Sequence, residues 1–160
     1  MEILVRWATR WDRKVLTEMI CELARQHGHL TSTDTVSSAF DYALNHPERI
    51  RIAVAQNEGK ELLGTASLHE AYSTWDASLY GTIEDVFTLP EHRGKGVATA
   101  LLNLLNEESQ RRGYCRVELQ VQEDNDKAWK FYEGRGMSFS GYIVYEKSLR
   151  EDTSTDERGE

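Results

Sequence analysis

Cysteine, proline and long hydrophobic runs are all scarce in this chain of 160 residues. Its two cysteines, Cys21 and Cys115, lie far apart in apolar surroundings without a C-x-x-C spacing. This favours buried free thiols in a reducing compartment over a disulfide, metal or redox site. No apolar stretch approaches the roughly 18 residues that a membrane span needs, and the chain opens without a signal-peptide pattern. We therefore expect a cytoplasmic protein that does not enter a membrane.

Basic residues are outnumbered: 19 Lys and Arg stand against 27 Asp and Glu, which gives a net charge of −8. Because nucleic-acid phosphates need a basic surface, this charge argues against a nucleic-acid partner and favours cationic small molecules. Hydrophobic residues make up 39% of the chain, enough for one real core. We expect a single domain over residues 1–149, followed by a polar and mobile tail at 150–160.

Hydrophobic periodicity divides the chain into helices and strands. A helix is predicted from Asp12 to His27, with Gly28 as its C-cap. A second helix follows a cap at Thr33 or Asp34 and stops before Pro47. The other predicted elements are strands at 3–7, 51–56, 62–69 and 78–89, a loop at 71–76, a helix at 97–112, a strand at 116–121, a helix from the cap at 124–126 to 133, and strands at Phe139 and 142–149.

The turn after the predicted strand at 78–89 is rich in glycine. It reads Arg93-Gly94-Lys95-Gly96-Val97-Ala98, and glycine lets the main chain turn sharply and approach a ligand closely. The helix that starts here would direct its N–H groups and positive dipole end into the turn, which makes a seat for an anion such as phosphate. The Walker loop fails on spacing, and the G-x-G-x-x-G fingerprint fails because Thr99 stands where it needs glycine.

Two patterns, in this order along the chain, carry a resemblance to a known family. Arg93, Gly96 and Ala98 fit R-x-x-G-x-A, and the segment from Asn125 to Met137 fits N-x-x-A-x-x-F-Y-x-x-x-G-M. At these residues the chain resembles the GCN5-related N-acetyltransferases (GNAT). The resemblance implies an α/β fold in which a mixed central sheet of about seven strands is flanked by four helices, in the order βααβββαβαββ.

Acetyl-CoA is the co-substrate that the resemblance implies. Its pyrophosphate would lie against the glycine turn, and its pantetheine arm would bind like an added β-strand along the strand before the turn. One amide of that strand would face the acetyl oxygen as an oxyanion donor, and the side chain of Asn125 would hydrogen-bond the arm. The residues implied in binding the coenzyme are Val86, Phe87, Thr88, Arg93, Gly94, Lys95, Gly96, Val97, Ala98, Thr99 and Asn125.

Two side chains are predicted to handle the protons of the reaction. By the resemblance, Tyr132 protonates the departing thiolate, and a phenol pKa of about 10 against about 8.5 for a thiol suits this role. Glu84 shares a strand face with Val86 by period-two alternation and would deprotonate the amine, directly or through water. Asp85 would face the opposite side unless a bulge intervenes. Transfer would be direct, in a ternary complex, since neither cysteine lies in a matched pattern.

The expected acceptor is a small cationic primary amine. The segments Tyr72-Ser73-Thr74-Trp75 and Ile83-Glu84-Asp85 look like the polyamine and thialysine acetyltransferase branch, which implies substrate contacts from Tyr72, Trp75, Glu84 and Asp85. No metal is expected, because the H-x-H pair after the first helix lacks a third ligand. Two other functions stay open: acetylation of a protein or peptide amine, and acyl-CoA sensing without turnover. A homodimer is the assembly that the resemblance implies.

Overall fold

The computed structural model describes residues 2–149, so the tail expected at 150–160 lies outside the described residues. The chain divides into two compact units, one up to Gln120 and one that starts at Val121, and each is described by itself. The elements are β1 (Leu4–Trp7), η1 (Arg10–Asp12), α1 (Arg13–Gln26), α2 (Thr33–Asn45), β2 (Ile50–Gln56), β3 (Leu62–Ser73), β4 (Ser78–Thr88), η2 (Pro90–His92), α3 (Val97–Arg111), β5 (Val117–Glu118) and, in the second unit, α4 (Asp126–Glu133).

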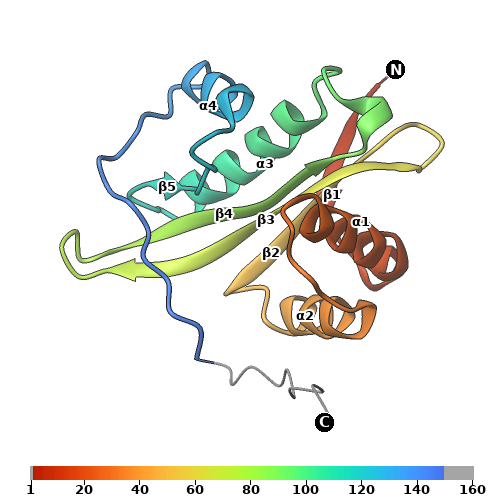
Figure 1. The fold of residues 1–160 in the computed structure, drawn as a ribbon, viewed down its shortest axis with the longest axis horizontal. Coiled ribbons are helices and arrows are strands. Elements are labelled where there is room, and N and C mark those ends of the chain that lie inside the picture. Colours follow the sequence, from red (N-terminus) through yellow and green to blue (C-terminus); the bar gives the residue numbers. More distant parts are fainter. Residues whose placement is uncertain (1, 150–160) are drawn as a thin grey trace, which may run out of the picture. The chain divides into compact units, whose positions relative to one another are not determined.

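A mixed sheet of five strands forms the centre of the first unit (Figure 1). Its order is β1-β2-β3-β4-β5, in which the first four strands are antiparallel to their neighbours and β5 lies parallel to β4. Helix α3 covers one face of the sheet, and α1 and α2 pack side by side against the other (Figure 1). This sheet and the four α-helices of the described residues confirm the α/β class.

The two faces of the sheet are packed differently. On the face under α1 and α2, a cluster of enclosed side chains joins helices to strands: Leu16, Met19, Phe40, Val54, Leu62 and Phe87. On the other face α3 approaches the backbone closely, since a Cβ at Gly64 would lie 2.9 Å from Val97 Cγ1 and 2.5 Å from the Phe87 carbonyl oxygen. Glycine at this position therefore lets the first turn of α3 rest directly on β3.

An ion cluster around the buried carboxylate of Glu108 ties α3 to β2. The side chain of Glu108 is 6% exposed and pairs with Arg51, Arg111 and Arg112 at 2.5, 2.7 and 2.7 Å. The hydrogen bond from Arg111, followed by those from Arg112 and Arg51, lowers the pKa of Glu108 to about 2 against the opposing effect of burial. The guanidinium of Arg51 also stacks on the ring of Trp7 at 3.8 Å. Helix α3 is thus fixed to the sheet by charge as well as by apolar packing.

The β3–β4 hairpin is longer than the sequence predicts. Strand β3 continues to Ser73 instead of ending at His69, because residues 70–73 pair with residues 78–81 of β4. The predicted loop at 71–76 therefore shrinks to a turn at 74–77, in which the Ser73 hydroxyl donates to Asp76 Oδ2 at 2.7 Å. Tyr72 is a strand residue as a result, and Trp75 lies in the turn.

Two further local predictions are wrong. The N-cap of α2 is Ser32 rather than Thr33 or Asp34, because its hydroxyl accepts the Thr35 N–H at 3.1 Å. Cys115 is exposed rather than buried, since it lies in the connection before β5 with its thiol 3.8 Å from an Asp76 carboxylate oxygen; Cys21 is half-buried, and both thiols are free. Among the described residues, no helix has both the length and the apolar character needed to cross a lipid bilayer.

The last two predicted strands do not form within the described residues up to 149. The segment from Tyr142 to Tyr145 is rich in strand-forming side chains, yet these four residues are 65–90% exposed. A strand needs a paired neighbour, and the described part of the second unit contains one helix and no strand that could supply it. The expected sheet of about seven strands therefore has five in the described chain.

Candidate active site

The glycine turn leads from β4 into α3 through two left-handed residues. Gly94 has φ +73° and Gly96, the N-cap of α3, has φ +91°. A Cβ at Gly94 would meet nothing within 4 Å, and one at Gly96 only Ile3 Cδ1 at 3.8 Å, so the glycines are needed for their conformation and not for space. Within residues 2–149 no side chain caps α3, and the N–H groups and positive dipole end of its first turn face the loop. This arrangement fits a pyrophosphate.

Two side chains flank the glycine turn. The guanidinium of Arg93 donates to the Thr88 carbonyl and to Gln26 Oε1, both at 3.2 Å, so this side chain folds back onto β4 and α1. Lys95 is exposed at the tip of the turn. Nδ1 of His92, just before the turn, is enclosed and makes no hydrogen bond within the described part of the chain. Arg93 thus braces the loop, whereas the charge of Lys95 remains at the surface.

Among the described residues, one edge of β4 is unpaired over its last six residues. Strand β5 pairs with β4 only at Gly81 and Thr82, opposite Val117 and Glu118. Beyond this point, the described residues provide β4 with pairing only from β3. An open strand edge binds an extended chain through main-chain hydrogen bonds. The stretch of Val86, Phe87 and Thr88 therefore offers such groups, and the buried ring of Phe87 confines that residue's contribution to its backbone.

A β-bulge in β4 changes which way the two acidic residues face. Thr65 pairs with Phe87 but Ser67 pairs with Glu84, so β4 has one extra residue here, and Asp85 adopts φ +54°. Strict alternation, which would place Asp85 opposite Glu84, is therefore wrong for this segment. Both residues are exposed, and their carboxylate oxygens lie within 4.8 Å of each other and of a ring nitrogen of His69.

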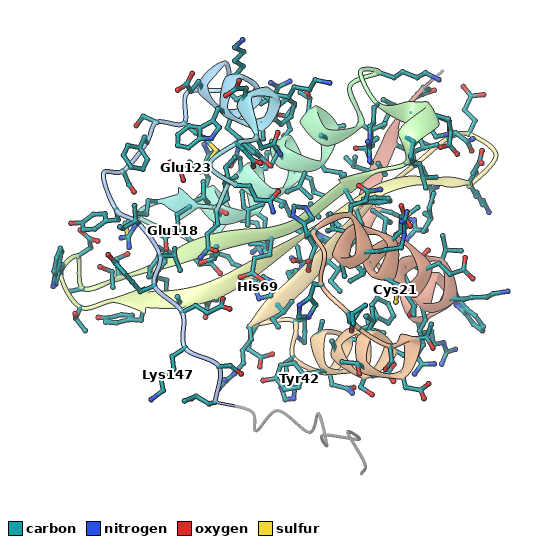
Figure 2. The ribbon with its side chains drawn as sticks, viewed as in Figure 1. Cys21, Tyr42, His69, Glu118, Glu123 and Lys147 are labelled. Atoms are coloured by element: carbon teal, nitrogen blue, oxygen red, sulfur yellow. The ribbon has the colours of Figure 1, made fainter. Side chains whose placement is uncertain are left out.

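His69 is the site residue that the sequence prediction missed. It lies on β3 (Figure 2), and its Nε2 is 2.9 Å from the hydroxyl of Ser67 and 3.8 Å from Glu84 Oε2. The same Ser67 hydroxyl lies 3.2 Å from Asp85 Oδ2. The hairpin register brings these four residues together, and in the sequence only the spacing of two polar residues, Ser67 and His69, on one face of β3 could have drawn attention to His69. Together they can bind a cation or accept protons.

Two hollows adjoin this acidic cluster. A cavity of about 100 Å³ lies between α1, α2 and the sheet, and Ser67, His69 and Asp85 form part of its lining. A wider pocket of about 600 Å³ lies over the ends of β2 and β3 and contains Tyr72. His69 lines both hollows. Trp75 lines neither and is 88% exposed at the hairpin tip.

The second unit carries the other two predicted site residues on and before α4. Asn125 is the N-cap, and its Oδ1 accepts the Ala128 N–H at 3.1 Å, so its Nδ2 group is the part that could reach a ligand. Tyr132 contacts Phe131 edge to face, with ring centroids 5.1 Å apart. Burial raises the pKa of the Tyr132 phenol above its ordinary value, against an opposing effect of Arg135. The phenol is therefore kept in its proton-donating form.

The sequence profile of the acetyltransferase (GNAT) family matches residues 14–137, which is well over half of the chain. The chain belongs to the GNAT family. Members of this family use acetyl-CoA, and the glycine turn, the uncapped start of α3 and the open edge of β4 fit its pyrophosphate and pantetheine arm.

Solved structures share the fold of this GNAT protein. A possible acetyltransferase from Clostridium difficile 630 is 20% identical with a TM-score of 0.82, over 94% of this chain and 100% of that one. Glucosamine-6-phosphate N-acetyltransferase from Arabidopsis thaliana is 22% identical with a TM-score of 0.75, over 94% and 100%. AAC(6')-Iy, in complex with the bisubstrate analogue CoA-S-monomethyl-acetylneamine, is 16% identical with a TM-score of 0.80, over 92% and 99%. At these identities the likeness concerns the fold alone.

Proposed function

We propose that this chain transfers the acetyl group of acetyl-CoA to a primary amine of a small cationic acceptor, directly within a ternary complex. The observation that carries the proposal is the β4 bulge, which places the carboxylate of Glu84 beside His69 and Asp85 on the strand whose other edge is open. A base for the amine and a main-chain track for the donor therefore belong to one strand. The negative net charge also favours a cationic acceptor.

The donor would be held mainly by backbone. Gly94 to Thr99 would face the pyrophosphate, helped by the dipole of α3 and by the charge of Lys95. The main chain of Val86 to Thr88 would hold the pantetheine arm, and one of its amides would support the negative charge that develops on the acetyl oxygen. In the second unit, Asn125 would add a side-chain hydrogen bond. Acetyl-CoA itself supplies the activated thioester.

In the proposed reaction the acceptor nitrogen loses two protons, one to Glu84 and one to Tyr132. The acceptor arrives as an ammonium ion, and Glu84 takes one proton, which frees the nitrogen lone pair to attack the thioester carbon. The C–N bond forms and the C–S bond breaks, with the electron pair leaving on sulfur. Tyr132 gives its phenolic proton to that sulfur, and the second surplus proton of the nitrogen restores the phenol. His69, Ser67 and Asp85 surround Glu84 and would orient the ammonium group.

Release of CoA thiol from acetyl-CoA tests the proposal, with a panel of monoamines, short diamines, spermidine and a peptide with a free N-terminus. Tyr132→Phe and Glu84→Gln should each lower kcat by about 100-fold or more while acetyl-CoA still binds, because each removes one proton transfer. Tyr145→Phe and Glu58→Gln are matched controls at exposed positions and should behave like the wild type. Full turnover by Tyr132→Phe would refute the acid role. Acetyl-CoA binding with no thiol release from any amine of the panel would favour a sensor, or an acceptor outside the panel, over the proposed transfer.

A further inference from the structure

We infer that the acceptor is a primary monoamine with a compact apolar substituent, and that this substituent occupies the cavity between α1, α2 and the sheet. The inference rests on the acetyl transfer proposed above and specifies its substrate class. The cavity of about 100 Å³ has its polar groups gathered toward the β4 bulge, where Ser67, His69 and Asp85 contribute to its lining. An amine with its nitrogen at this end would direct its substituent toward the helices.

The remaining lining of the cavity consists of hydrocarbon side chains and of two threonines whose hydroxyls already have partners. Leu16 and Ile20 of α1, Val36 and Phe40 of α2, and Ile50 and Ile52 of β2 contribute only hydrocarbon. The two threonines of the lining have hydroxyls that are already engaged. Thr17 Oγ1 lies 3.1 Å from Ser37 Oγ, and Thr65 Oγ1 donates to the Ala53 carbonyl at 2.9 Å. Within the cavity, the groups suited to an ammonium ion are therefore those at the bulge.

This lining discriminates against a second charged group on the acceptor. An ammonium ion among the helix side chains would lose its water without gaining a counter-ion, whereas each methylene buried there strengthens binding by about fourfold. Since an apolar cavity of about 150 Å³ accommodates benzene, a cavity of this size suits a group of about three to five carbons.

The wider pocket does not provide the missing counter-ion. Its acidic residues are Glu48 and Glu70, and each already has partners. Glu70 accepts the Tyr114 hydroxyl at 2.7 Å and pairs with Arg112 at 3.4 Å, while Glu48 lies 3.4 Å from His46 Nδ1. Arg49 adds a positive charge to the same lining. Arg112 and Arg49 therefore offset the two carboxylates, so that the second ammonium group of a diamine extending from the bulge would find no net negative charge in this pocket.

On the helix side, Ala39 marks a place where the cavity reaches the surface, as Asp85 does at the bulge. Ala39 lines the cavity and is nevertheless exposed, whereas Ala43, one turn further along α2, is buried. A larger side chain at Ala39 can therefore enter the mouth of the cavity without disturbing the core. Its neighbour Ser38 is also exposed on α2 but does not line the cavity, so Ser38→Leu is a matched control for Ala39→Leu.

The test compares 3-methylbutylamine with 1,4-diaminobutane, using thiol release for turnover and calorimetry for amine binding to the CoA-saturated protein. The expected kcat/KM is at least tenfold higher for 3-methylbutylamine. Ala39→Leu should lower kcat/KM for 3-methylbutylamine at least tenfold and weaken the binding of this amine. The kcat/KM of Ser38→Leu should stay within twofold of the wild-type value. Both variants should bind acetyl-CoA and melt as the wild type does, which separates a blocked cavity from a damaged fold.

The inference is overturned if 1,4-diaminobutane reacts as well or better, if Ala39→Leu has no effect on 3-methylbutylamine, or if that amine neither binds nor reacts. These outcomes are distinct from failure of the acetyl transfer. Turnover of the diamine alone overturns the inference and supports the transfer. Binding of 3-methylbutylamine that Ala39→Leu abolishes, without thiol release from any amine, supports the cavity and refutes the transfer.

Discussion

Replacing Glu108 by glutamine should destabilise the protein at neutral pH and have little effect in acid. The carboxylate of Glu108 lies among Arg51, Arg111 and Arg112, and these arginines lower its pKa from the ordinary 4.5 to about 2. With about 1.4 kcal/mol for each tenfold change in proton affinity, this difference corresponds to about 3 kcal/mol of folding free energy. The size matches the loss expected when one partner of a buried ion pair is removed.

The sign of the pH dependence follows from the lowered pKa. A carboxylate whose pKa is lower in the folded protein contributes its full stabilisation above the unfolded value of 4.5 and loses it as the pH falls toward about 2. At about pH 3 the loss should amount to about 2 kcal/mol. The free energies of unfolding of the wild type and Glu108→Gln should therefore differ by about 3 kcal/mol at neutral pH and by about 1 kcal/mol near pH 3.

Urea unfolding followed by circular dichroism at the two pH values measures this difference directly. Glu22→Gln is the matched control, because Glu22 also pairs with an arginine three residues away, at 2.7 Å, but on the exposed face of α1. Because water screens that pair, Glu22→Gln should lower the free energy of unfolding much less than Glu108→Gln does. An equal gap between the wild type and Glu108→Gln at both pH values would refute the reasoning, as would a variant as stable as the wild type at neutral pH.

Two further predictions concern the candidate site. Gly96→Ala should weaken acetyl-CoA binding and lower the melting temperature, because a Cβ at φ +91° costs about 1–2 kcal/mol although space is available; calorimetry and thermal unfolding test this, and unchanged binding would contradict it. The alkaline limb of the kcat profile should lie above the ordinary phenol pKa of about 10, since burial keeps Tyr132 protonated; a limb well below that value would exclude Tyr132 as the acid.

The features of the site that depend on local sequence were predictable. Gly94 and Gly96 adopt the left-handed conformations that a sharp turn requires, and α3 starts at Val97, where the helical period of apolar residues begins. Asn125 likewise caps α4, as its position before a helical run indicates. In these segments a few neighbouring residues determine the backbone, so a sequence pattern is sufficient.

Features that depend on pairing between distant segments were not predictable in the same way. The bulge at Asp85 exists because β3 and β4 change register between Thr65 and Ser67, and no glycine marks the place. His69 belongs to the site only because that register brings it near Glu84. The segment 142–149 shows the converse, since strand-forming residues remain unpaired where the described second unit offers no partner strand.

The conformation of Asp85 links the bulge to its chemistry. A residue with a Cβ at φ +54° is strained by about 1 kcal/mol, although aspartate tolerates this region better than most residues, and glycine would relieve the strain. Glycine would keep the bulge but remove the carboxylate that lines the cavity and lies 3.2 Å from the Ser67 hydroxyl. Strain that coincides with a charged group at the mouth of an apolar cavity is typical of functional sites. The bulge brings two carboxylates to one place, where the proposed ammonium group would find both a counter-ion and a base.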